Sequence, residues 1–86
     1  MSNVGKLVLS NAGRDKGMYL AVIGESGCYL ILADGRHRKI ENPKHKKSKH
    51  VEILDKTLDS EFVKALQNGC ITNKMLWRQI KESLNS

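Results

Sequence analysis

Short apolar runs broken by glycine turns fill the first 54 residues or so, and they constrain the fold more than any other feature of this sequence. The runs are rich in Val, Ile, Leu and Tyr and too short for helices, which is typical of a small antiparallel β unit. Residues 5–10 (GKLVLS) predict a first strand with Leu7 and Leu9 on one face. In the turn that follows, Gly13 and Gly17 are free to take positive φ.

Two longer runs predict the middle of the sheet. Residues 18–25 (MYLAVIGE) and 28–35 (CYLILADG) are apolar on both faces and are joined by a hairpin-length connection. Residues 33–41 (ADGRHRKIE) then predict a fourth, mostly polar strand, and residues 50–54 (HVEIL) a fifth with Val51 and Ile53 inward. Because five short strands bury two faces only by curling, we expect a small five-stranded barrel without free edges.

After Leu54 the apolar period changes from two to about 3.6, which predicts two short C-terminal helices. Asp59 and Thr72 are candidate N-caps, and Gly69 is a candidate left-handed C-cap. Two apolar faces follow, made of Phe62, Val63 and Leu66 and of Leu76, Trp77, Ile80 and Leu84, with Leu58 and Val63 spaced as a hydrophobic staple. We therefore expect a mainly β fold: a barrel over residues 1–55 and a helical extension over 56–86 packed on it, together one domain. The sequence leaves open whether Trp77 lies in the core, which is the commoner case, or forms part of a docking face.

The net charge lies in one segment. Residues 36–50 (RHRKIENPKHKKSKH) carry seven of the 15 lysines and arginines but one of the nine acids, so this segment accounts for the whole formal net charge of +6. Such segregation favours an anionic partner over a plain solvated loop. RNA, DNA, anionic lipid and an acidic protein all fit this pattern.

The sequence offers no arrangement for catalysis. It contains no spacing typical of a nucleophile with its base and no glycine-rich phosphate loop. Asp15, Asp34 and Glu41 stand beside basic residues, where carboxylates usually balance charge or cap turns. We predict that the protein is not an enzyme and has no small-molecule substrate.

No metal site or cofactor is predicted either. His45 and His50 have the spacing of a metal-binding pair, but Cys28 and Cys70 are single, far apart, and expected to be small buried apolar residues. The chain shows neither a signal-peptide pattern nor a run of about 20 apolar residues, so we expect a cytoplasmic protein with no membrane partner.

Residues 4–54 resemble a known family. GKLVLSNAGRDKGMYLAVIG resembles the KOW motif of ribosomal proteins and of transcription elongation factors of the Nus type. The continuation YLILADGRHRKIENPKHKKSKH is similar to large-subunit ribosomal proteins of the fourteen-e type and to small bacterial relatives of them. The resemblance implies a Src-homology-three-like barrel that binds RNA, usually ribosomal RNA. After residue 55 the chain departs from the ribosomal members.

Carried over by position, the resemblance also implies the residues that face RNA. These are Arg14, Lys16 and Gly17 in the first turn, Arg36, Arg38 and Lys39 after the ADG block, and Lys44, Lys46, Lys47 and Lys49 in the basic stretch. We expect Arg36, Arg38 and Lys39 on a strand with fixed positions, and Lys44 to Lys49 in a mobile loop suited to adaptable phosphate contacts.

These patterns predict a ribosomal or ribosome-associated protein that binds structured RNA by phosphate contacts. Few aromatic side chains are expected on the surface, which disfavours stacking on unpaired bases. A second basic stripe, Lys74, Arg78 and Lys81, is either the wet side of a helix or an extension of the footprint. Two alternatives stay open: a protein-interaction module of a transcription or translation complex, and a DNA-binding barrel.

Overall fold

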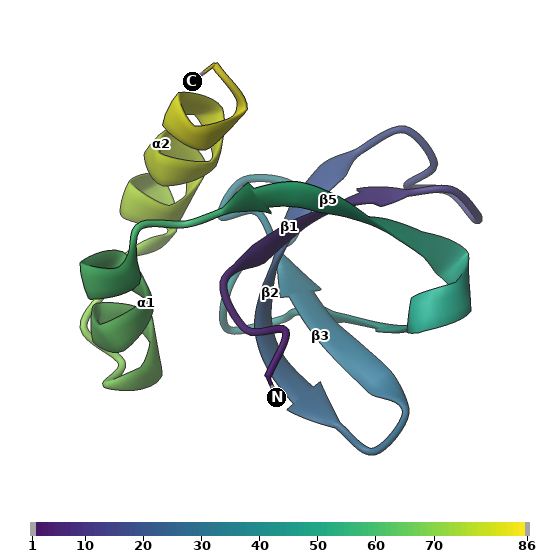
Figure 1. Cartoon of the computed structure of the whole chain (residues 1–86), viewed down its shortest axis with the longest axis horizontal. Coiled ribbons are helices and arrows are strands. Elements are labelled where there is room, and N and C mark those ends of the chain that lie inside the picture. The colour runs from purple at the N-terminus through teal and green to yellow at the C-terminus, as the bar shows by residue number, and fades with distance from the viewer. Residues whose placement is uncertain (1, 86) are drawn as a thin grey trace.

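The computed structural model describes residues 2–85 and shows an antiparallel sheet followed by two helices (Figure 1). This confirms the predicted mainly β fold with a helical C-terminus. The elements are β1 (Lys6–Ser10), β2 (Tyr19–Ser26), β3 (Tyr29–Ala33), β4 (Lys44–Lys47), the short 3-10 turn η1 (Ser48–His50), β5 (Val51–Thr57), α1 (Ser60–Gln67) and α2 (Asn73–Leu84).

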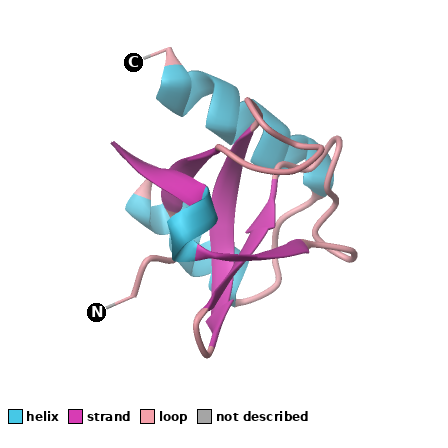
Figure 2. Cartoon of the chain, turned by 90° about the vertical axis from the view of Figure 1, so that its right-hand side faces the viewer, coloured by secondary structure: helices cyan, strands magenta, loops and turns pink. Residues whose placement is uncertain are grey.

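The strands form one sheet in the order β4-β3-β2-β1-β5, and every neighbouring pair is antiparallel. Register shifts between Val22 and Gly24 and between Lys6 and Val8 bend strands that belong to the curled sheet (Figure 2). The curl is barrel-like, but the expected closure is incomplete. Within residues 2–85, β4 and β5 are the two edges and do not pair with each other.

Both faces of the sheet are covered, as expected from two strands that are apolar on both faces. One buried cluster is made of strand residues alone: Val8, Leu20, Val22, Leu30, Leu32 and Val51. The other joins the sheet to the helices and contains Leu7, Ala21, Ala33, Leu58, Leu76 and Ile80. Alternate residues of one strand therefore enter different clusters, and the two helices lie together on one side of the sheet (Figure 1).

The helix ends follow their sequence signals. Thr72 Oγ1 accepts a hydrogen bond of 3.2 Å from Met75 N, so Thr72 caps α2. Gly69 has a φ of 72°, and hydrogen bonds from Cys70 N to Ala65 O and from Gly69 N to Leu66 O close a Schellman motif after α1. Asp59 occupies the N-cap position of α1, although its side chain makes no capping hydrogen bond.

Several local expectations are wrong. Residues 34–43 form a loop instead of a fourth strand, and the stretch expected to be a mobile loop supplies β4. Ile53 is 39% exposed instead of inward, because β5 is an edge strand with part of its length uncovered. Cys28 lies in the β2–β3 turn and Cys70 between the helices, and both are exposed. β5 also continues to Thr57, past the end of the predicted fifth strand at Leu54.

No helix among the described residues combines the length and the apolar composition that a membrane span requires.

Candidate nucleic-acid interface

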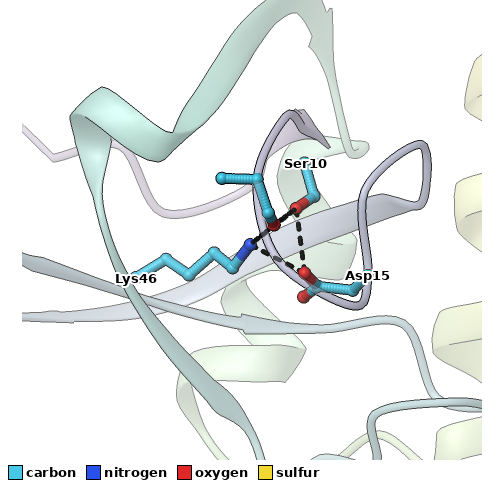
Figure 3. A network of polar contacts seen from close by, with 4 residues as sticks. Ser10, Asp15 and Lys46 are labelled. Carbon is cyan, nitrogen blue, oxygen red and sulfur yellow. Dashed lines mark hydrogen bonds and ion pairs between the residues drawn. The ribbon is translucent and has the colours of Figure 1, made fainter.

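A buried polar network ties β4 to the β1–β2 loop, residues 11–18 (Figure 3). Lys46 Nζ lies 2.7 Å from Asp15 Oδ1 and 2.7 Å from Ser10 Oγ, and it also donates to the carbonyl of Ala12. Ser10 Oγ in turn lies 3.1 Å from Asp15 Oδ1. An ammonium group has three protons to donate, and all three have partners here.

Burial and pairing withdraw Lys46 from the cations that can contact a phosphate. The residue is 8% exposed, whereas its neighbours His45 and Lys47 are exposed. Side chains alternate along a strand, so one position of KHKK faces the sheet interior while those on either side face solvent. An inward lysine on an edge strand also discourages pairing with another chain.

The electrostatics of Asp15 follow from this pairing. Burial raises the pKa of the carboxyl, but hydrogen bonds from Lys46 and Ser10 and the positive charge of Lys46 outweigh it, so the pKa lies below its ordinary value. Asp15 Oδ2 is buried and has no hydrogen-bond partner among the described residues. The ionised carboxylate is thus held by Lys46 through one oxygen.

The network places the two basic segments side by side. Arg14 and Lys16 flank Asp15 and are exposed, while Lys47 follows Lys46 on β4. The backbone amide of Asn11 donates to His50 O at 3.2 Å, which also brings η1 and its exposed Lys49 against this loop. Gly17 closes the loop with a φ of 90° and a 2.8 Å bond from its amide to Ser10 O. The expected positive φ at Gly13 and Gly17 is confirmed.

The second basic loop, residues 34–43, turns around a buried aspartate. Asp34 is 1% exposed, and its Oδ1 accepts 2.8 Å hydrogen bonds from the backbone amides of Arg36 and Arg38. Its Oδ2 lies 3.1 Å from His37 Nδ1. Arg36 and Lys39 are exposed and Arg38 is half-buried. These three residues are therefore positioned by an Asp-centred turn and not by the strand that the sequence predicts.

The start of α2 holds this loop in place. Asn73 Oδ1 accepts from the amide of Ile40 at 2.8 Å, and Asn73 Nδ2 donates to both carboxylate oxygens of Glu41 at 3.0 Å. The bond from Asn73 lowers the pKa of Glu41. Gly35 packs so closely that a Cβ atom on it would lie 2.1 Å from Asn73 O. No local sequence pattern reveals the role of Asn73, because its partners lie more than 30 residues away.

Aromatic rings are more accessible than expected. Tyr19 and Tyr29 are each 42% exposed, and Trp77 is half-buried and not in the buried core. The Arg36 guanidinium lies 5.3 Å and Lys81 Nζ 5.8 Å from the centre of the Trp77 ring, and Lys47 Nζ lies 5.9 Å from that of Tyr29. These are cation–π distances. Arginine and lysine side chains thus mix with aromatic rings across this surface.

The remaining candidates are distributed as follows. Lys44 is half-buried on β4, and the α2 stripe of Lys74, Arg78 and Lys81 is exposed.

Within residues 2–85, no three His, Cys, Asp or Glu side chains are grouped closely enough to hold a metal ion. No model of a protein family matches this chain, and a comparison with curated proteins finds no match.

Proposed function

We propose that this chain is a non-enzymatic RNA-binding protein that uses its two basic loops and β4 to bind structured RNA, with ribosomal RNA as the preferred class. A ribosomal or ribosome-associated role in the cytoplasm belongs to the same proposal. The contact residues are Arg14, Lys16, Gly17, Arg36, Arg38, Lys39, Lys44, Lys47 and Lys49. Lys46 is excluded because Asp15 and Ser10 occupy its ammonium group.

The Lys46–Asp15 ion pair is the observation that carries the proposal. It fixes the loop bearing Arg14 and Lys16 against the strand and turn bearing Lys47 and Lys49. The backbone segments that carry these exposed cations are distant along the chain but are held next to each other without ordering a flexible tail. Phosphate neutralisation on such a surface supplies sequence-independent affinity, while its fixed shape selects a folded polyanion.

The salt dependence of binding tests the electrostatic mechanism. If about five of the exposed cations engage phosphates, the logarithm of the association constant should fall with the logarithm of salt concentration at a slope of roughly −3.5 to −4.5. A ribosomal RNA fragment and a DNA duplex of matched sequence should be titrated in parallel. A slope near zero for RNA contradicts the mechanism, and tighter binding to DNA favours the DNA alternative.

Charge-neutral variants locate the surface. Lys47→Gln with Lys49→Gln removes two exposed cations and should reduce the salt slope by about 1.4 to 1.8. The matched control, Lys6→Gln with Lys64→Gln, removes the same charge from β1 and α1 and should leave the slope within about 0.3 of the unmodified protein. Equal losses in the two variants would mean that net charge, and not this surface, attracts RNA.

Sedimentation of the native protein tests the biological setting. On a sucrose gradient we expect the protein to travel with the large ribosomal subunit and to return to the top after ribonuclease treatment. A fast-sedimenting complex that survives complete RNA digestion would instead support the protein-interaction alternative.

A further inference from the structure

A small pocket opens between the β1–β2 loop and α2, beside the proposed RNA surface. Its volume is about 200 Å³, and its lining residues include Met18, Tyr19, His37, Trp77, Lys81 and Leu84. The volume is below the roughly 300 Å³ at which pockets for drug-sized ligands begin. The pocket therefore suits one flat ring system and not a larger ligand or a folded peptide.

Aromatic and cationic groups surround one side of this pocket. His37 meets Trp77 edge-on, with 6.0 Å between the ring centres, and Arg36 and Lys81 both lie over the Trp77 ring. Arg36 and Lys81 are exposed. A ligand that matches this site has a planar face for Trp77 and a negative charge for the two cations. A nucleotide has both.

We propose that the pocket receives one unpaired nucleotide of the bound RNA, with its base stacked on Trp77 and its phosphate paired with Arg36 or Lys81. This inference rests on the proposed RNA-binding function. An exposed cation–π contact is weaker than the stacking of a base on an aromatic ring, so the base displaces a cation that then meets the phosphate. The positions of Arg36 and Lys81 over the Trp77 ring in the free protein are therefore compatible with stacking of a base on that ring.

His37 adds a polar atom to the pocket. Its Nδ1 is held by Asp34 Oδ2 at 3.1 Å, which fixes the ring and leaves Nε2 as the nitrogen available to a base edge. A hydrogen bond to Nε2 favours bases that have a matching donor or acceptor on the edge that faces His37. The buried carboxylate of Asp34 therefore positions both the basic turn and the histidine beside it.

The pocket is continuous with the proposed RNA surface, which favours a nucleotide within RNA over a free nucleotide. Gly17 lines it and belongs to the loop that carries Arg14 and Lys16. A duplex on this surface would pass next to the pocket, so a base extruded from that duplex has a short distance to cross.

The fluorescence of the native protein tests the inference directly, because Trp77 is the sole tryptophan of the chain. The probes are an RNA hairpin with one unpaired adenosine, the same hairpin without it, and free adenosine monophosphate. We expect the first hairpin to quench Trp77 and to bind at least about fivefold more tightly than the second, which should leave the emission unchanged.

A variant separates stacking from general affinity. Trp77→Leu should remove the preference for the unpaired adenosine while the affinity for the paired hairpin, followed by anisotropy of labelled RNA, stays the same. Tyr29→Leu removes another exposed ring that also has a lysine over it, and it should preserve the preference. Circular dichroism checks that Trp77→Leu folds, and if it does not, the fluorescence of the native protein still decides.

The outcomes distinguish this inference from the proposed function. Equal affinity for the two hairpins with unchanged emission overturns the pocket and leaves RNA binding intact. Binding of neither hairpin overturns both proposals. Saturable quenching by free adenosine monophosphate, with none from the hairpin that has the unpaired adenosine, overturns the assignment to RNA and identifies a nucleotide pocket instead.

Discussion

The two basic loops each fold around a buried aspartate, and the two carboxylates have different kinds of partner. Asp15 pairs with Lys46, a side chain 31 positions away on β4. Asp34 accepts from backbone amides of its own loop and lies against His37. The aspartate of the first loop is therefore held by a long-range charge, whereas the aspartate of the second is held by backbone amides of its own loop.

The second loop has an additional support that the first lacks, which is the start of α2. Asn73 bonds to residues 40 and 41, and its backbone leaves no space for a side chain at Gly35. The helical extension thus orients a basic loop as well as covering the sheet. Substitutions that act on one support should disturb one loop and leave the other in place.

Lys46→Met should have the largest effect, because it leaves the buried carboxylate of Asp15 without its counter-ion. We expect the free energy of unfolding, measured with urea, to fall by about 3 kcal/mol. Lys47→Met on the exposed side of β4 should change it by less than about 0.5 kcal/mol.

The double variant Asp15→Asn with Lys46→Met tests the cause of that loss. Because an amide carries no charge to leave unpaired, it should recover most of the stability lost in Lys46→Met. A single Lys46→Met variant as stable as the unmodified protein would show that Asp15 finds another partner, and would remove the distinction between the two loops.

Gly35→Ala should have an effect of similar size. The new Cβ would meet Asn73 O at 2.1 Å, and the φ of 82° is unfavourable for alanine. We expect a loss of about 3 kcal/mol from the clash and the backbone strain together. Gly17→Ala is the matched control: its φ is 90°, but its Cβ would have no atom within 4 Å, so it should lose only about 1 kcal/mol. Equal losses would mean that α2 does not constrain the second loop.

Asn73→Ala tests the same support more gently. It removes the acceptor for the Ile40 amide, and we expect a loss of about 1 kcal/mol. Hydrogen exchange measured by nuclear magnetic resonance should accelerate at the Ile40 amide. Thr72→Ala weakens the cap of α2 by a similar amount, but it should leave Ile40 protected. If both variants expose Ile40 equally, α2 holds the loop through its general stability and not through Asn73.

The features that could be predicted from the sequence are those determined by a few neighbouring residues. The turn glycines, the Thr72 cap and the Schellman motif at Gly69 each need only local geometry. Strands that are apolar on both faces indicate directly that both faces are buried. The polar strand was misplaced because KHKK contains no apolar residue to reveal its period. Its inward lysine is recognisable only once Asp15 is known to face it.

The candidate site likewise combines features that the sequence predicts with features that depend on tertiary contacts. Charge segregation indicated residues 36–50, where Lys47 and Lys49 are exposed, and the glycine turn added Arg14 and Lys16, which are exposed as well. The contributions of Asn73 and Trp77 arise from contacts between α2 and the loop at residues 34–43. Such contacts depend on how the helices dock, and the spacing of apolar residues along a helix does not specify its neighbours.

The smallest expected effect is the pH dependence that Asp15 gives to the first loop. Its folded-state pKa lies below the ordinary value of about 3.9, so between the two the unfolded chain binds more protons and acidification favours unfolding. This contribution to stability is present above the unfolded pKa and is lost as the pH falls through the folded one. The effect is small because burial, which is the largest single influence on this carboxyl, acts in the opposite direction.

Urea unfolding from about pH 6 to pH 2 isolates the contribution of Asp15 when the native protein is compared with Asp15→Asn, since the amide does not titrate. The free energy of unfolding of the native protein should decline more steeply below about pH 4 than that of the variant. Parallel curves would show that burial cancels the pairing with Lys46. A native protein that gains stability relative to the variant on acidification would show that burial exceeds it, and that Lys46 anchors the first loop without stabilising the ionised carboxylate.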